Sequence, residues 1–409
     1  MRELTMLRKN KAEFEMVGNV KLSDFTFKME QESQKSDWIY NSLNLGIDCG
    51  INGTYYASMM GGYGSQRKNL LYVHGTKEEN GKMRDDFNNR FTIDFDDRFE
   101  KEILDTIGSM RFINVGIVDD GEKIIFEKFL SEYDAITYLE GNLRDGMKVK
   151  VKGNLSYREY EGQVTVQKNI NKIYLVPEET PCKATFTQAI LLDKDAIGKL
   201  DKETNTIPLT VSVIENIREY AGQPIRRMVN GKTVKSVNLP LIKTMNFNVG
   251  EDVEKAKKML KQFKVKSNKF VTQLVVEGHF SRGAINTVEV TMDDLDEDIK
   301  EMIELGFLDK DEILGQIAKA NGSGNSPETM IIDKPCIKFV GKDDKKIPSI
   351  DKVIDIYTLD DINVEYILED CFGDEQPKQE ELEVDEDKAL DSLLDKDTDS
   401  DDDDWLNDL

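Results

Sequence analysis

Residues 147–175 read MKVKVKGNLSYREYEGQVTVQKNINKIYL, and they carry the clearest structural signal in the chain. Over 147–152 apolar residues alternate with lysines, a period of two that places apolar side chains on one face of a strand and ammonium groups on the other. Gly153 permits a bulge or a sharp bend in this strand. The polar, aromatic segment 157–162 predicts a hairpin loop, and the apolar positions over 164–175 predict the returning strand.

A helix is predicted just before this hairpin. The residues from Ser131 to Asp134 resemble a capping box, and Ile136 and Leu139 follow on one helical face. The elements expected upstream are strands over 17–29, 38–51, 69–74 and 112–128 and a short helix over 97–108.

The same order of elements recurs downstream. The expected elements are strands over 184–192, 207–217 and 237–248, a helix over 252–263, a strand over 270–280 and a return strand over 287–291. Gly278 follows its helix and strand as Gly153 does, and a basic hairpin tip at 281–283 comes next. An internal duplication is therefore expected.

Three strands, a helix and two further strands form the order of the OB-fold, a five-stranded Greek-key barrel. We therefore predict a mainly β protein with some helix and two OB-like barrels. The expected divisions are a first OB-like domain with insertions at 1–176, a linker at 177–182, a second OB-like domain with helical and β additions at 183–372, and a disordered acidic tail at 373–409.

Composition and motifs argue against several protein classes. The 409 residues carry a formal charge of −24, and residues 373–409 account for −14 of it through 17 acids and three lysines. No run is apolar and long enough to span a bilayer, and no signal-peptide core follows the basic start. The chain has four scattered cysteines, two histidines and no phosphate-loop motif, so we expect no metal site, no cofactor and no enzyme activity.

Aromatic and basic residues recur in both units, as a groove for single-stranded nucleic acid requires. Cations contact the phosphates, and flat rings stack on the bases. The candidates are Tyr55, Tyr56, Arg67, Lys68, Lys148, Lys150, Lys152, Tyr157, Arg158, Tyr160, Tyr220, Arg226, Arg227, Lys232, Lys235, Lys243, Phe280 and Arg282.

Each candidate also has an ordinary structural explanation. Alternating lysines commonly form the solvated side of a half-buried strand, and Tyr220 could cover the edge of a core. The loop over 218–235 is the stronger signal, because it holds five cations and one acid in a strongly acidic chain. Recurrence at matching positions of two barrels favours nucleic-acid binding.

The chain ends on an aspartate run followed by an apolar tip. A solubilising tail gains nothing from a large exposed indole, whereas a docking peptide uses one as its anchor. The partner-binding candidates are Asp401, Asp402, Asp403, Asp404, Trp405, Leu406 and Leu409.

With these features the chain resembles the bacterial and bacteriophage single-stranded-DNA-binding proteins. The resemblance is specific at 399–409, moderate at 131–176 and topological elsewhere. It implies single-stranded DNA as ligand, protection of that strand in replication or recombination, recruitment of partner proteins through the tip, and a bacterial host cytoplasm if the protein is phage-encoded. The chain departs from this family in two ways. It is far longer than the common one-barrel subunit, and it ends on Trp405 to Leu409 where the family tip usually ends on phenylalanine.

Two other functions remain open at this point. OB barrels also bind proteins, so the chain could be an adaptor or a viral assembly or host-modulating factor whose tail mimics nucleic acid. An annealing or recombination-mediator protein is the third possibility.

Overall fold

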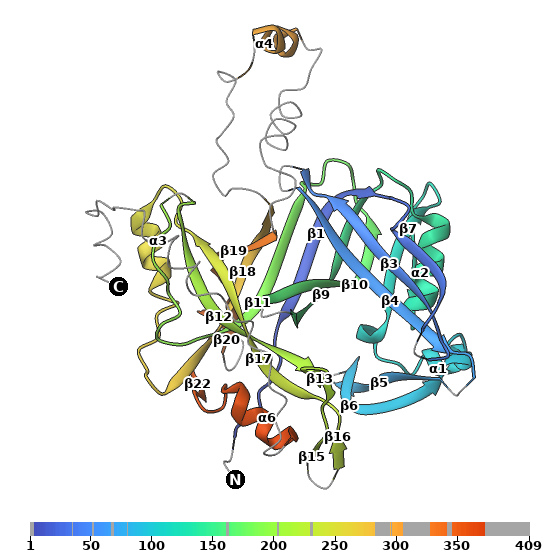
Figure 1. Ribbon diagram of the computed structural model, residues 1–409. Helices are drawn as coiled ribbons and strands as arrows, with labels where there is room; N and C mark the ends of the chain where they lie inside the picture. The colour runs from blue at the N-terminus through green and yellow to red at the C-terminus, as the bar shows by residue number, and fades with distance from the viewer. Residues whose placement is uncertain are drawn as a thin grey trace.

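The structure consists mainly of two closed five-stranded barrels that stand side by side (Figure 1). It is a computed structural model that describes residues 4–34, 36–50, 53–66, 69–79, 81–160, 163–202, 204–229, 232–282, 295, 297–305, 328–341 and 346–372. The predicted acidic tail and its partner-binding residues lie outside the described residues.

Barrel 1 closes through five strands, β1 (Ala12–Lys21), β3 (Trp38–Asp48), β4 (Thr54–Gly64), β10 (Gln163–Leu175) and β9 (Lys148–Tyr160). Four of the five pairings are antiparallel, and β4 pairs with β10 in parallel. Helix α2 (Glu132–Asn142) precedes β9, and the Ser131 side chain accepts a hydrogen bond from the backbone N–H of Tyr133, as the capping pattern predicts.

Barrel 2 repeats this arrangement with β11 (Lys183–Leu192), β12 (Thr206–Ile217), β17 (Val237–Asn248), β19 (Glu328–Pro335) and β18 (Phe270–Arg282). Again one pairing, β17 with β19, is parallel and the others are antiparallel. Helix α3 (Val253–Leu260) precedes β18 as α2 precedes β9. The strand order of the OB-fold therefore occurs twice.

The two barrels meet where β1 pairs antiparallel with β11, and Phe14 lies opposite Phe186 in this pairing. Gly153 pairs with Phe14 on one side, and Gly278 pairs with Phe186 on the other. A β-carbon at either glycine would overlap a neighbouring carbonyl oxygen, that of Asn169 or that of Ile331. Each glycine also lies beside a bulge in its partner strand, so the predicted correspondence of the two glycines is confirmed.

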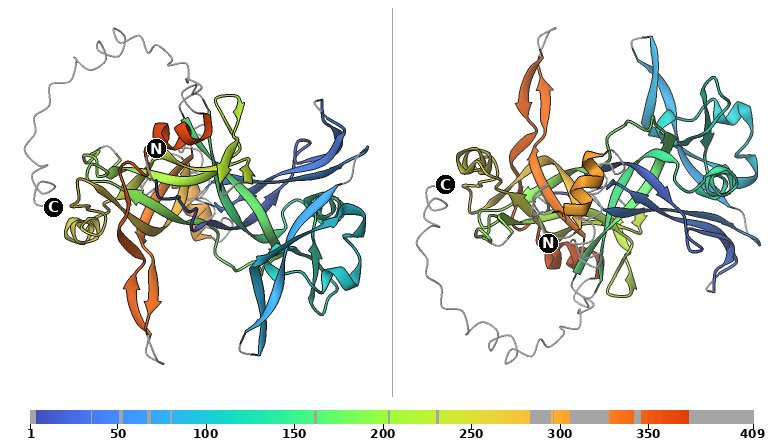
Figure 2. Two further views of the ribbon diagram at one scale, coloured as in Figure 1. Left: turned by 90° about the horizontal axis from the view of Figure 1, so that it is seen from below. Right: turned by 90° about the horizontal axis from the view of Figure 1, so that it is seen from above.

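Additions surround this pair of barrels, and the β20–β21 hairpin projects from the body (Figure 2). The additions to barrel 1 are β2 (Phe27–Glu32), β5 (Leu70–Glu79), β6 (Lys82–Asp94), α1 (Lys101–Leu104), β7 (Ile113–Asp119) and β8 (Ile124–Phe129). Those to barrel 2 are β13 (Glu219–Tyr220), β14 (Gln223–Pro224), β15 (Arg227–Val229), β16 (Lys232–Val234), α4 (Glu297–Glu304), β20 (Ile337–Val340), β21 (Ile347–Ile350), β22 (Lys352–Thr358) and α6 (Val364–Phe372).

Four predicted elements differ from the structure. The strand expected over 17–29 is two strands, β1 and β2, because the Ser23 carbonyl accepts a hydrogen bond from Thr26 N–H in a turn between them. The strand expected over 112–128 is the β7–β8 hairpin. The helix expected over 97–108 shortens to α1, because Ile107 forms a β-bridge with Gly75.

The fourth difference concerns the closing strand of barrel 2. The return strand expected over 287–291 lies outside the described residues, and β19 takes its place beside β18. The hairpin tip expected at 281–283 is therefore the start of a long insertion. One continuous apolar core includes Leu45 and Val151 of barrel 1 and Leu209 and Val276 of barrel 2.

Candidate nucleic-acid interface

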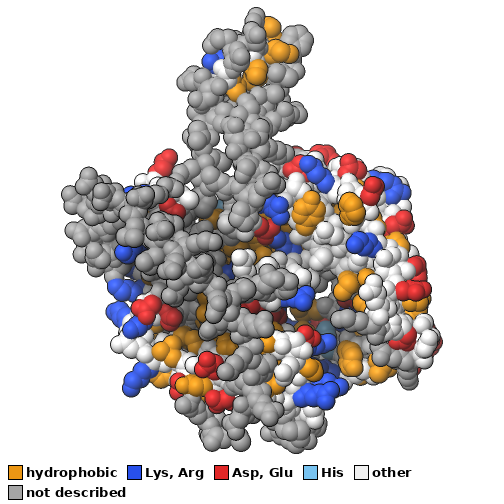
Figure 3. Space-filling model, viewed as in Figure 1, with side chains coloured by type: hydrophobic (Ala, Val, Ile, Leu, Met, Phe, Trp, Pro, Cys, Tyr) orange, Lys and Arg blue, Asp and Glu red, His pale blue; other side chains and the backbone are white. Residues whose placement is uncertain are grey.

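The outer face of β3 and β4 is an uncharged surface. Alternate residues of β3 from Trp38 to Gly46 and of β4 from Tyr56 to Gly62 point away from the core, and none of them is acidic. In Figure 3 the area over these two strands is mainly white and orange. The chain has 79 acidic residues in 409, so an acid-free face of this size is informative. Strands two and three form the ligand face of OB-folds.

Aromatic side chains occupy both ends of this face. Tyr56 is 49% exposed, and its ring leans over Gly46, whose missing side chain leaves room for it. Trp38 and Tyr40 stack on each other with their ring centroids 4.8 Å apart. Six residues of β3 separate Gly46 from Tyr40, a span of about 20 Å. Two ring surfaces therefore lie along one strand direction, far enough apart to contact different bases of one single strand.

Each barrel extends a pair of strands to the other barrel. The end of β18 reaches β4, where the Tyr55 hydroxyl donates a 2.7 Å hydrogen bond to the Phe280 carbonyl. The end of β9 reaches β12, where Tyr157 N–H donates to the Glu215 carboxylate at 2.9 Å. Figure 1 shows the upper ends of β18 and β19 beside barrel 1. The outer face of barrel 1 is thus completed by barrel 2.

Arg282, the last residue of β18, connects this contact to the uncharged face. Its guanidinium carbon lies 5.9 Å from the centroid of the Tyr56 ring and 5.8 Å from that of Tyr55. The Nη2 atom of Arg282 lies 3.6 Å from Oε2 of Glu328, and the Arg282 side chain is 34% exposed. Arg282 and Tyr56 were both predicted to bind nucleic acid, and the structure brings them together.

Behind Arg282 lie two less accessible lysines, Lys168 of β10 and Lys243 of β17. Lys168 forms an ion pair with Glu328 and has 3% of its side chain exposed. Burial lowers the pKa of Lys168, and the Arg282 charge lowers it further against the opposing effect of Glu328. Lys243 donates a 2.8 Å hydrogen bond to the Val164 carbonyl, and burial lowers its pKa as well.

The corresponding face of barrel 2, on β12 and β17, is also free of acids at its outward positions. Thr210 and Thr244 are exposed, and Ile242 is 68% exposed. The predicted cations Arg158, Arg226 and Lys235 are exposed near its edge.

Tyr220 departs from its predicted role at this edge. It packs against the small core under α6, and burial together with Glu159 and Glu365 raises its pKa. Arg227 is partly buried, and among the described residues its Nε has no hydrogen-bond partner.

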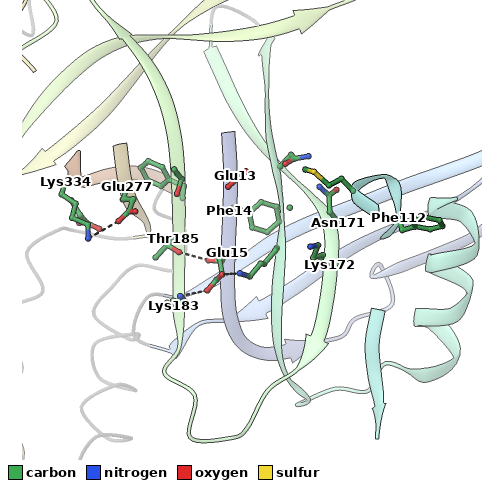
Figure 4. A pocket seen from close by; sticks show the side chains of 18 residues that line it. Glu13, Phe14, Glu15, Phe112, Asn171, Lys172, Lys183, Thr185, Glu277 and Lys334 are labelled. Carbon is green, nitrogen blue, oxygen red and sulfur yellow. Dashed lines mark hydrogen bonds and ion pairs between the residues drawn. The ribbon is translucent and has the colours of Figure 1, made fainter. Parts of the chain in front are cut away.

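A groove of about 820 Å³ runs over the junction of β9, β1, β11 and β18 (Figure 4). Phe14, Phe186 and Lys152 are among the residues that line it. Glu15 binds Lys152 and Lys183, and it also faces Lys150 at 3.9 Å. Two lysines of the predicted row, Lys150 and Lys152, therefore face this carboxylate, which leaves the groove with little excess positive charge.

Several site predictions are corrected by burial. The rings of Tyr55, Tyr157 and Phe280 are at most 4% exposed, so none of them can stack on a base. Lys148 is 8% exposed, and its ammonium group donates to the Cys182 sulfur at 3.0 Å. The period of two itself places these three rings inward. Tyr55 and Tyr157 share a strand face with the buried Ala57 and Leu155, and Phe280 shares one with Val276. Arg67, Lys68 and the side chains of Tyr160 and Lys232 lie outside what the structure describes.

Sequence reasoning missed Trp38, Tyr40 and Met60, which share the β3–β4 face with Tyr56. The signal was present, because the outward residues of β3 read Trp38-Tyr40-Ser42-Asn44-Gly46 at a period of two. This face becomes visible only when the register of β3 against β4 is known.

A protein-family model named YorF matches residues 76–307, more than half of the chain. The chain belongs to the YorF family. The matched region includes β9 to β18 and therefore parts of both barrels. A comparison with curated protein sequences gives no match.

Two solved structures are similar to the chain. The wild-type single-stranded DNA binding protein from Thermus aquaticus has 11% identity and a TM-score of 0.28, over 67% of this chain and 86% of that chain. A deletion mutant of that protein has 10% identity and a TM-score of 0.26, over 67% and 89%. The OB-fold of this chain is established by its own strand pairings.

Two further findings concern the part of the chain that the structure describes. No helix there is long and apolar enough to cross a membrane. No group of three or more His, Cys, Asp or Glu side chains within those residues could hold a metal ion.

Proposed function

We propose that the protein binds single-stranded DNA without strong sequence preference, and that the outer face of β3 and β4 is its principal contact surface. The observation that carries the proposal is the half-exposed Tyr56 ring beside Arg282, on a face that also holds the Trp38–Tyr40 stack. Rings bind any base through its π-face, and cations bind any phosphate, so this combination is tolerant of sequence.

A single-strand ligand suits this face better than a duplex. Base stacking needs bases that are free of partners, and each stacked base contributes about 1–3 kcal/mol. An adaptor would bind a protein, and protein partners anchor themselves through apolar pockets. Between the aromatic ends this face presents the small uncharged side chains Ser42, Asn44 and Ser58, which form no such pocket.

Titration of fluorescent oligo-dT with the full chain tests the proposal. Tyr56→Ala and Trp38→Ala should each weaken binding by about 5- to 100-fold if the ring stacks on a base. Phe339→Ala is the matched control, because Phe339 is 68% exposed on the β20–β21 hairpin, away from the face. Equal affinities for all four proteins, or preference for duplex over single strand, would refute the assignment.

We further propose that the tail serves as an autoinhibitor and a docking peptide in replication or recombination. The charge of −14 over 373–409 competes with DNA for cations, while Trp405, Leu406 and Leu409 supply an apolar contact. Deleting 373–409 should tighten single-strand binding most at low salt. Deleting only 405–409 should leave DNA binding nearly intact and abolish capture of a replication protein. If capture is unchanged, the tip is not a docking peptide and the tail serves only to solubilise the protein.

A further inference from the structure

The contact between the two barrels holds more positive than negative charge. Lys168, Lys243 and Arg282 come from three different strands and share one carboxylate, that of Glu328. We infer that this cluster is a phosphate-binding subsite, which holds one phosphodiester group of the single strand beside Tyr56. The inference rests on the proposed function and specifies where the backbone of the strand is bound.

Burial makes the charge imbalance significant. A buried ammonium group is costly unless it is paired, and Lys168 is paired with Glu328. Arg282 lies farther from the same carboxylate at 3.6 Å, and Lys243 has a neutral carbonyl as its hydrogen-bond partner. Among the described residues, the three cations of this cluster therefore face one anion, and an additional anion would complete the cluster.

The surroundings favour a phosphodiester as that anion. The Lys168 ammonium lies 4.3 Å from the centroid of the Phe280 ring, which with Tyr55 closes the inner side of the cluster. Arg282 remains open to solvent on the outer side, next to the exposed Tyr56 ring. A base on Tyr56 would thus place its own backbone near Arg282. A guanidinium group suits the two oxygens of a phosphate because its donors form a planar fork.

Salt dependence of oligo-dT binding by the full chain tests this subsite. Single strands lose affinity with a slope of about −0.7 in log K against log[salt] for each contacted phosphate. Arg282→Gln should weaken binding several-fold and reduce the slope by about 0.7. Lys334→Gln is the matched control, since Lys334 pairs with Glu277 at the groove and is 63% exposed.

Glu328→Gln should change DNA affinity in the opposite direction from Arg282→Gln. Removing the Glu328 carboxylate should tighten binding at low salt by about three- to tenfold, whereas removing a merely structural carboxylate would not. An unchanged slope in Arg282→Gln with Tyr56→Ala still defective would overturn the subsite and leave the proposed function standing. Absence of oligo-dT binding by the wild-type chain would overturn both.

Discussion

Tyr56 and Tyr157 are both tyrosines of barrel strands, but only the Tyr56 ring is accessible. Tyr157 is 4% exposed, and its hydroxyl donates to Gln188 at 2.9 Å between the barrels. Tyr157→Ala should therefore lower the free energy of unfolding by about 3–5 kcal/mol, as for other large buried rings. Tyr56→Ala should change it by less than about 1 kcal/mol. Urea denaturation checks both values, and equal losses would contradict the difference in burial.

Glu15 is expected to make stability depend on pH. Burial raises its pKa, but hydrogen bonds from Lys152 and Lys183 outweigh that effect, so its pKa is lowered. A lowered folded pKa stabilises the protein above the unfolded value of about 4.3, and this contribution is lost as the pH falls through the folded pKa.

Glu15→Gln should therefore cost about 1–2 kcal/mol at neutral pH, allowing for partial exposure, and much less near pH 3.5. Thermal unfolding at the two pH values measures the difference. Glu13→Gln, at an exposed position on the same strand, should change little at either pH. A deficit for Glu15→Gln that persists unchanged in acid would show that the carboxylate charge is not responsible.

At the scale of elements, Gly153 and Gly278 should be equally intolerant of a side chain. A β-carbon at either position meets a backbone carbonyl and a phenylalanine ring, which cannot both move. Gly153→Ala and Gly278→Ala should each destabilise the chain by more than about 2 kcal/mol. Gly141→Ala in α2 meets no atom within 4 Å and should instead stabilise by about 0.5–1 kcal/mol. Tolerance at one glycine alone would contradict the equivalence of the two barrels.

Local patterns predicted most strands well and the closing strand of barrel 2 poorly. The strand over 237–248 and the helix at Ser131 follow from alternation and capping, which depend on neighbouring residues. The pairing of β18 with β19 joins segments separated by an insertion of 45 residues, from 283 to 327, and no local signal marks where the chain returns. The prediction that Lys148 binds nucleic acid was wrong for a similar reason, because Cys182, near the start of β11 in the sequence, accepts a hydrogen bond from its ammonium group.

At the scale of the whole molecule, the barrels should unfold together. Their core is continuous, and Lys168–Glu328 and Tyr157–Glu215 contacts cross between them. Urea denaturation followed by tryptophan fluorescence and by circular dichroism should give one coincident transition. Two separated transitions would show that the barrels are energetically independent.

The site was predictable only in part from the sequence. Residue type and spacing identified Tyr56 and Arg282 as candidates, although 226 residues separate them. Their proximity depends on the crossing of β18 to barrel 1, and the same crossing buries Tyr55 and Phe280. The period of two along β4 separates the exposed Tyr56 from the buried Tyr55, but it does not indicate that Arg282 lies beside Tyr56.

Photo-crosslinking of iodouridine-substituted oligo-dT to the full chain, followed by mass spectrometry of the peptides, locates the DNA-binding face. We expect adducts on Tyr56 and on Trp38 or Tyr40, at the two ends of the β3–β4 face. Phe339→Ala should leave this pattern unchanged, and Tyr56→Ala should remove the adduct at that end. Adducts confined to the groove beside Lys152, or to the β20–β21 hairpin, would contradict the assignment of the DNA-binding face.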